Sequence, residues 1–509
     1  MNFGNSPGWL LALSLMLVQS GHAEEPRLRP LSLDDCLESA LIHNREIQIE
    51  RINPRIAQLS LDSAQGVYDP TFAIDARHLD IADTGGYDPK DLSRDAIYDA
   101  KANVVKAGFT GYAPSGLSYV IGGDYANSFG ERNFVNFDSY NIGAGITVRQ
   151  PLMRNFWIDQ ARLTIQVSRK NLRVTELGVQ YVVMDVINRV QWAYFDLAYA
   201  RQALKVQEKL LEVRQRFEAE TKQQVQVGRV PDLELRLATA EVARAQVQLV
   251  AARNVIALAE NQLKTLLGDD FVSSVGTSLA PTDALVALPE TFNLAQSWTR
   301  GLAQRPDLLQ MRVDLEKADL DLKYRRNQLW PSLDVVAGYG RRGSDTKEAI
   351  PPKPAFASAS TAFDQIDNGV AANDLYGVIF SVPLSRTRER ANYRASKETR
   401  EQFVLRIKQR EELVLREIDD AVKLAGNRLD EVAATRRSAE YAQAAVEAEQ
   451  VKLAAGRSTP YVVLQLQGDH ARAELEAILA RANYRKALAQ LEFAEASSFE
   501  RHKINLELK

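Results

Sequence analysis

Cysteine and histidine are scarce in this chain of 509 residues. Cys36 is the only cysteine, so no internal disulfide can form. The five histidines are scattered, and no two of them stand at the spacing of zinc ligands. A disulfide-stapled scaffold is therefore excluded, and structural zinc or Cys/His catalysis lacks its usual ligands.

The chain also has no large excess of positive or negative charge. Lys plus Arg number 63 against 66 Asp plus Glu, the net charge is −3, and no basic block interrupts the mixture. This balance argues against nucleic-acid binding. Neither a nucleophile motif, a phosphate loop nor a metal-ligand cluster stands above chance, so we expect no enzyme and no cofactor.

Long hydrophobic runs are missing as well. The one apolar run, residues 9–18, is followed by Gly21-x-Ala23, small residues at the positions that signal peptidase reads. We interpret residues 1–23 as a secretory signal. The alternative is a buried N-terminal helix, because the segment before the run has no Lys or Arg. No later segment approaches the ~20 apolar residues of a transmembrane helix.

The chain repeats itself. Residues 31–74 match 292–335 without a gap, with Pro70 aligned to Pro331. Residues 143–155 match 375–387 through Pro151 and Pro383, and the dipeptide at 228–229 recurs at 456–457. Because the three matches keep their order, the sequence predicts a tandem duplication, with repeats over 24–290 and 291–509.

Each repeat reads as helix, strand, loop, strand, long helix, turn and long helix. The four strands are expected near 71–80, 139–150, 332–341 and 374–382, each with one apolar and one small or polar face. Such strands fit either a lipid-facing wall or the cover of a soluble core. An additional hairpin is predicted at 104–112 and 117–125. By topology this hairpin and the segment 344–373 are expected at the end of the sheet away from the long helices, where they could cap that end or extend the sheet.

Heptad spacing of apolar residues marks the long helices, expected over 160–228, 232–267, 388–455 and 460–496. In the first, steps of four and three connect Val179, Val183, Val186 and Val190. At ~1.5 Å per residue it would extend about 100 Å. A compact globule of this chain length is only about 60 Å across. The spacing therefore predicts a rod built on coiled-coil hairpins.

The turns that close the two hairpins have the same pattern. Gly228 and Gly456 each follow a long helix, and Pro231 or Pro460 stands at the start of the next one. This pattern predicts a left-handed glycine cap and a proline helix start. The exposed tips would also form a docking surface.

The tandem units, the paired strands between heptad helices, and the phrases Gln150-Pro151-Leu152 and Leu266-Leu267-Gly268 resemble the TolC family of outer-membrane efflux proteins. The resemblance implies a mainly α fold with β: a trimeric outer-membrane β-barrel, four strands per protomer, continued by a long α-helical coiled-coil periplasmic tunnel. It implies a passive channel of a tripartite efflux pump or type I secretion system. The alternative is a secreted periplasmic coiled-coil adaptor or scaffold.

The same resemblance implies the partners and the sites. The partners are two further copies in a homotrimer, a periplasmic adaptor (membrane fusion) protein, an inner-membrane RND, ABC or MFS transporter, and outer-membrane lipid. Docking of the adaptor falls on Gly228, Arg229, Val230, Pro231, Gly456, Arg457, Ser458 and Thr459. Candidates for the tunnel entrance are Asp232, Glu234, Arg236, Val462 and Gln465. Some family members have an aspartate ring after the second turn, but here no acid precedes Asp469, so a strong cation-binding constriction is not expected.

Overall fold

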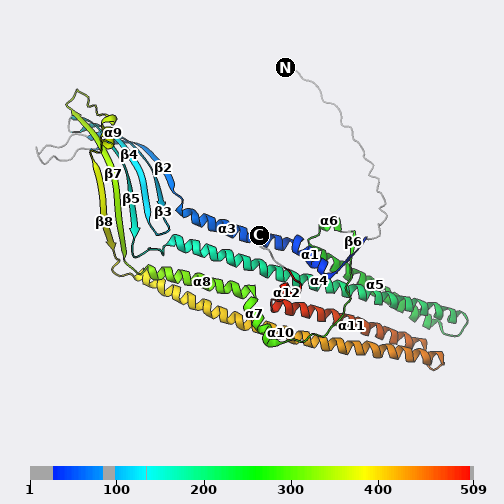
Figure 1. Cartoon of the computed structure of the whole chain (residues 1–509). Coiled ribbons are helices and arrows are strands. Elements are labelled where there is room, and N and C mark those ends of the chain that lie inside the picture. Colours follow the sequence, from blue (N-terminus) through cyan, green and yellow to red (C-terminus); the bar gives the residue numbers. More distant parts are fainter. Residues whose placement is uncertain (1–26, 84–97, 133–134, 275, 505–509) are drawn as a thin grey trace, which may run out of the picture. The chain divides into compact units, whose positions relative to one another are not determined.

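The computed structural model describes residues 27–83, 98–132, 135–274 and 276–504; the predicted signal at 1–23 lies outside them. The chain is helix-rich with one large sheet (Figure 1). It divides into two compact units. Unit 1 comprises Met1–Arg45, Asp185–Thr291 and Ala421–Phe493, and unit 2 comprises Glu46–Met184, Phe292–Asp420 and Ala494–Lys509. Each unit thus combines segments from both predicted repeats.

The helices are α1 (Leu33–His43), α2 (Arg45–Glu50), α3 (Ile52–Gln65), a 3₁₀ turn η1 (Gly66–Tyr68), α4 (Gln160–Gln226), α5 (Asp232–Leu267), α6 (Phe271–Ser274), α7 (Leu294–Gln304), α8 (Pro306–Asn327), α9 (Ala359–Asp367), α10 (Thr387–Ala454), α11 (Pro460–Ala494) and α12 (Ser498–Arg501). The strands are β1 (Arg27–Leu31), β2 (Thr71–Asp83), β3 (Tyr98–Tyr112), β4 (Ser118–Arg132), β5 (Val135–Pro151), β6 (Thr277–Pro281), β7 (Ser332–Ala349) and β8 (Ala372–Ser381).

The four long helices α4, α5, α10 and α11 lie where the heptad spacing predicted them, within two residues at each end. The predicted seam is buried, for example at Val183 and Val190 on α4 and at Ala238 and Val242 on α5. Small and large side chains alternate along it, which lets neighbouring helices approach closely.

The first helix of each repeat was predicted as one continuous helix, and this prediction was wrong. The backbone is extended at Asn44, between α1 and α2, and at Arg305, between α7 and α8. Before Pro306 the helical conformation is sterically disfavoured. Asn44 has no following proline; its side-chain amide donates instead to the carbonyl of Leu266 at 2.8 Å.

The large sheet has six strands in the order β2-β3-β4-β5-β7-β8, every neighbouring pair antiparallel (Figure 1). The four predicted strands are present as β2, β5, β7 and β8. The expectation of four strands per chain was nevertheless wrong, because the additional hairpin pairs on both sides and becomes β3 and β4. Its backbone hydrogen bonds are satisfied within the sheet instead of in a separate cap.

The turn of this hairpin lies at the end of the sheet where β5 ends, beside Gln150. The Gln150 side-chain amide donates to the Ser115 carbonyl at 3.1 Å, and the Ser115 hydroxyl donates to the Gln150 side-chain oxygen at 3.0 Å. Gly116 has φ +87°, which favours glycine there. Since β5 leads directly toward α4, this turn lies at the helix-proximal end of the sheet and not at the opposite end, where both insertions were expected.

Candidate functional site

The tip of the first helical hairpin is closed by a left-handed glycine. Gly228 has φ +72°, its N–H donates to the Val225 carbonyl at 3.0 Å, and the Arg229 N–H donates to the Gln224 carbonyl at 2.9 Å. Pro231 precedes α5 with φ −68°. These bonds satisfy carbonyls at the end of α4, so the chain reverses as the sequence predicted.

The second tip repeats this geometry. Gly456 has φ +70°, its N–H donates to the Leu453 carbonyl at 2.9 Å, and the Arg457 N–H donates to the Lys452 carbonyl at 2.8 Å. The second tip differs from the first in the Ser458 hydroxyl, which donates to Glu449 at 2.6 Å. Both tips leave an exposed arginine, Arg229 or Arg457, on a turn fixed by main-chain bonds.

Ser458 belongs to a small network that fixes the second tip. The Lys452 ammonium also donates to the Glu449 carboxylate, at 2.8 Å. The hydrogen bonds from Lys452 and Ser458 lower the pKa of Glu449. Lys452 and Glu449 both lie in the last turns of α10, whereas Ser458 lies in the turn, so the bond from Ser458 ties the tip to its own helix.

The predicted entrance residues occupy the first turns of α5 and α11. Asp232 and Arg236 form an ion pair at 3.0 Å on the exposed side of α5. Val462 and Gln465 are exposed one turn apart on α11, so they share one face of that helix. Glu234 is half-buried.

Two residues beside these candidates were missed from the sequence. Leu233 and Leu237 are exposed apolar residues on the first turns of α5, off the buried seam through Ala238 and Val242. Their i, i+4 spacing defines a second apolar line on the same helix. That line could have been found by testing each helix for two seams instead of one.

Further along α5 the exposed apolar line continues through Val247, Val250 and Leu258. A similar exposed line occupies α2 and α3, at Ile49, Ile52, Ile56 and Leu59. We call these the α5 stripe and the α3 stripe. Exposed apolar side chains that gather along one side of a helix are typical of surfaces that take part in an interaction.

A buried arginine joins the two helices of the first hairpin. The Arg214 guanidinium on α4 donates to the Glu241 carbonyl on α5 at 3.2 Å and pairs with its carboxylate at 3.3 Å. The Thr239 hydroxyl donates to Glu218 at 2.7 Å, closer to the tip. These cross-helix contacts, in addition to the heptad seam, hold the hairpin together.

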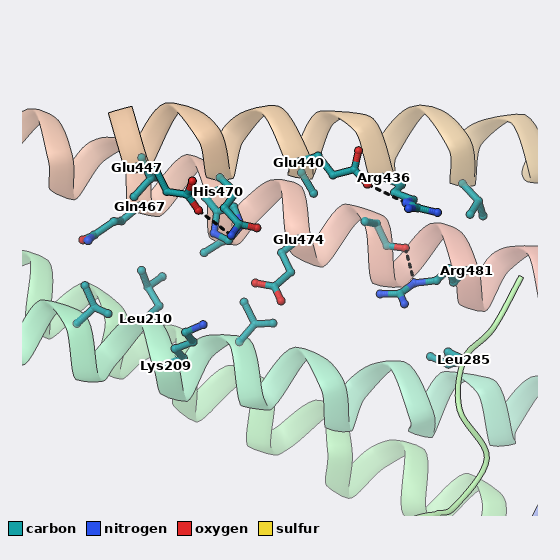
Figure 2. A pocket seen from close by; sticks show the side chains of 18 of the residues that line it. Lys209, Leu210, Leu285, Arg436, Glu440, Glu447, Gln467, His470, Glu474 and Arg481 are labelled. Atoms are coloured by element: carbon teal, nitrogen blue, oxygen red, sulfur yellow. Dashed lines mark hydrogen bonds and ion pairs between the residues drawn. The ribbon is translucent and has the colours of Figure 1, made fainter. Parts of the chain in front are cut away.

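Unit 1 contains a groove of about 800 Å³ between the hairpins. Its walls are α4, α10, α11 and the connecting segment 285–287. Figure 2 shows Lys209 from α4 and Glu474 from α11 directed into it, with the Arg436–Glu440 ion pair on the α10 wall. The groove carries both signs of charge beside apolar side chains.

The two faces of the six-stranded sheet differ in chemistry. One row in register reads Phe72, Phe109, Ile121, Ile146 and Tyr339 from β2 to β7, and we call its side of the sheet the apolar face. The Phe72 and Phe109 rings are 4.9 Å apart.

On the opposite side, which we call the polar face, one row in register contains Asp75, Lys106, Asp124 and Arg342. Arg342 reaches Asp124 at 3.8 Å across β5. Gly143 makes this contact possible, because a Cβ there would lie 2.8 Å from the Asp124 carboxylate. Charges on one face and aromatic residues on the other are typical of a wall between water and an apolar medium.

In the parts of the chain that the structure describes, no helix is long and apolar enough to cross a membrane. Among the same residues, no group of three or more His, Cys, Asp or Glu side chains is placed to hold a metal ion.

Several solved structures of outer-membrane channels share the fold of this chain. The outer membrane channel CmeC of Campylobacter jejuni superposes with TM-score 0.66 at 15% identity, over 93% of this chain and 90% of that one. VceC of Vibrio cholerae gives 0.64 at 15% identity, over 91% and 95%. A crystal structure of CusC gives 0.65 at 15% identity, over 91% and 92%. The fold is therefore that of outer-membrane channels with a helical extension.

The sequence profile of the outer membrane efflux protein family matches residues 125–269 and 299–496, and the chain belongs to this family. The cation efflux system protein CusC of Escherichia coli K12 is 22% identical over 53% of this chain and 55% of its own length. The probable outer membrane lipoprotein SilC of Salmonella typhimurium is 20% identical over 51% and 52%. The chain thus spans about half the length of these curated relatives. Membership of the family places the protein in the outer membrane, with an extension into the periplasm.

Proposed function

We propose that three copies of this chain form the passive outer-membrane channel of a tripartite export system. The observation that carries this proposal is the sheet, which has one apolar and one polar face and an edge strand at each end, β2 and β8. A sheet with such faces can stand between lipid and water only if its edges are paired. Copies of the same chain supply the missing partners, with the apolar face toward lipid.

The exposed stripes on the helices support the same assembly. The α3 stripe has the 3–4–3 spacing of a coiled-coil seam, and Leu233, Leu237, Val247 and Leu258 of the α5 stripe fall on one heptad series. Both stripes lie exposed in the single chain. Packing of each stripe against a neighbouring copy would bury these side chains, at roughly 25 cal/mol per Å² of apolar area. Helices joined in this way would form the wall of a periplasmic tunnel, and the tandem repeats would place two hairpins per copy around it.

The tips are the proposed contact with a periplasmic adaptor, and through it with an inner-membrane transporter of the RND, ABC or MFS type. Arg229 and Arg457 stand exposed on rigid turns, and the groove of unit 1 has room for a helical segment. In this arrangement Asp232, Glu234, Arg236, Val462 and Gln465 lie near the tunnel entrance. The export system would be an efflux pump or a type I secretion system.

We expect the protein extracted in detergent to be a trimer. Light scattering should give a protein mass three times that of one chain, and negative-stain images should show three-fold particles. Extraction in buffer without detergent is the control. A water-soluble monomer or dimer would contradict the proposal and favour the adaptor or scaffold alternative.

Carboxylates added at the entrance should make the channel more selective for cations. The variant Val462→Asp/Gln465→Asp adds two carboxylates per copy on one face of α11, and we expect its reversal potential in a KCl gradient to move toward the cation side. The effect should be clear at 0.1 M salt, where the Debye length is about 10 Å, and weak at 1 M, where it is about 3 Å. Gln223→Asp/Gln226→Asp adds the same two carboxylates at exposed positions one turn apart on α4 and is the matched control. Equal shifts of the reversal potential in both variants would show that Val462 and Gln465 do not lie at the entrance.

A further inference from the structure

The hairpin β3–β4 is part of the sheet along its whole length. β3 pairs with β2 from Thr110 to Tyr98, and β4 pairs with β5 from Ser118 to Arg132. The alternative, a hairpin folded into or over a pore, would leave β2 and β5 adjacent, as β7 and β8 are adjacent in the second repeat. The first half of the chain therefore contributes four wall strands and the second half contributes two.

The hairpin has the same two faces as the strands around it. On the apolar face, Phe109 and Ile121 continue the row from Phe72 to Ile146. On the polar face, Lys106 stands in register with Asp75 and Asp124, so charges of alternating sign run across β2, β3 and β4. A hairpin that only plugged a pore would have no need for an apolar face in register with that of its neighbours.

A row of glycines also unites the hairpin with the original strands. Gly108, Gly122, Gly145 and Gly340 stand in register on the polar face of β3, β4, β5 and β7. A Cβ at any of the four would lie 2.6–2.9 Å from a carbonyl oxygen of the neighbouring strand. The polar face is therefore bare backbone along this row, and half of the row comes from the hairpin.

Resting on the proposed three-copy assembly, we propose that its barrel has eighteen strands, six from each copy, and that β8 of one copy pairs with β2 of the next. Six is an even number, so alternating strands make β2 and β8 antiparallel when copies are joined in a ring. β7 is longer than β8, and beyond the end of β8 the edge of β7 is covered by α9. There the Gln365 side chain accepts from the Ser344 N–H and donates to the Ser344 carbonyl, at 2.9 Å each.

The register of this joint follows from the pair β5–β7, which joins the two halves within one chain. There Val148 faces Ala337, and the Leu152 N–H donates to the Leu333 carbonyl at 2.7 Å. The alignment of Pro151 with Pro383 shows which residues of β8 correspond to those of β5. The alignment of Pro70 with Pro331 shows which residues of β2 correspond to those of β7. Phe380 should face Ala76 of the next copy, and the Leu384 N–H should donate to the Phe72 carbonyl. In the single chain the Leu384 side chain is 100% exposed, as expected before that strand is supplied.

The consequence is a wider conduit. At a strand spacing of about 4.8 Å and a tilt of about 40°, twelve strands enclose a backbone diameter of about 24 Å and eighteen enclose about 36 Å. The glycine row adds no side chains to this lumen. The outer-membrane segment would then admit solutes of nanometre width, and any finer selection would take place elsewhere along the channel.

Three cysteine pairs in the full chain test the strand order. Ile74→Cys with Ala107→Cys should form a disulfide within one chain, because these residues face each other across β2 and β3. Ile74→Cys with Ile146→Cys should stay reduced. In a four-stranded arrangement these residues would face each other, as Val335 and Val378 do in the second repeat. Ala76→Cys with Phe380→Cys should link most chains into dimers and trimers on a non-reducing gel.

The matched control for the joint is Ala76→Cys with Val378→Cys, two residues out of register and beyond disulfide reach at about 7–8 Å. Cys36 will not interfere, because burial raises the pKa of its thiol to about 12. A bond between Ile74→Cys and Ile146→Cys in a trimer, or a trimer in which Ala76→Cys and Phe380→Cys stay reduced, would overturn the eighteen-stranded barrel. Absence of any trimer by light scattering would instead overturn the proposed function.

Discussion

Replacing Arg305 with alanine should lower the stability of unit 2 by about 1.5–3 kcal/mol, because Asp307 and Glu417 lose the charged hydrogen bonds of one of their two arginine partners. Arg305 is 3% exposed and stands between α7 and α8. Its guanidinium binds Asp307 through two nitrogens, at 3.1 and 2.8 Å, and Glu417 at 2.5 Å, and it donates to the Ala494 carbonyl at 3.4 Å. Arg410 binds the same two carboxylates. Four charged side chains from α8, α10 and the residue before Pro306 thus form one network.

Thermal loss of the helical signal at 222 nm in detergent measures this effect, and a downward shift of roughly 3–12 °C is expected. The matched control is Arg436→Ala. It removes an exposed ion pair with Glu440 at 2.8 Å and should cost less than about 1 kcal/mol. Arg305→Lys should fall between the two, because lysine keeps the charge but loses the two-pronged contact. Equal stability of Arg305→Ala and Arg436→Ala would show that the network contributes nothing.

The same network gives a pH dependence of known sign. Burial by itself would raise the pKa of Asp307, but hydrogen bonds and charges from Arg305 and Arg410 hold it below its usual value. A carboxylate with a lowered pKa in the folded state stabilises that state above its unfolded pKa of about 3.9, and the stabilisation is lost as the pH falls through the folded pKa. Asp307→Asn should therefore lose this part of the acid sensitivity below about pH 4.

Replacing Gly268 with alanine should cause the second large loss of stability, in unit 1. Gly268 ends α5 with φ +75°, and an added Cβ would lie 2.2 Å from the carbonyl oxygen of His43. The left-handed conformation costs a residue with a side chain roughly 1–2 kcal/mol, and overpacking adds typically about 1–3 kcal/mol. The Asn44 amide donates to Leu266 beside this contact, so a displaced α1 would also lose that hydrogen bond.

The matched control is Gly426→Ala on α10, where nothing lies within 4 Å of the added Cβ. Since alanine favours a helix interior over glycine by roughly 0.5–1 kcal/mol, this variant should be slightly stabilised. Opposite signs for the two variants, in the same unfolding assay, would identify the contact with His43 as the cause. Equal effects would contradict it.

The long helices and the hairpin tips could be predicted because their signals are local. Heptad spacing along 160–226 marks the buried face of α4, and a glycine before a proline start marks each tip. The break at Arg305 does have a local signal, Pro306, which apolar spacing does not register. The break at Asn44 has none, because Asn44 is held by the Leu266 carbonyl, which is remote in the sequence.

For the candidate site, the sequence indicated which residues form the tips, but not how they are held or what lies beside them. The bond from Ser458 to Glu449 and the exposed pair Leu233 and Leu237 depend on how each turn is oriented about its helix. Helical spacing shows which residues share a face. It does not show whether a neighbouring helix covers that face.

By itself the sequence determined the element types, the four original strands, the two tips and the likeness to outer-membrane efflux proteins, because each depends on a short period or a motif. Only the tertiary structure decided that β3 and β4 stand between β2 and β5. Alternation along a strand fixes its two faces but not its neighbours. The neighbours follow from the backbone pairing of β3 with β2 on one side and with β4 on the other, which places Lys106 in register with Asp75 and Asp124. That pairing satisfies the backbone of the inserted hairpin, and so it sets the number of strands in the wall.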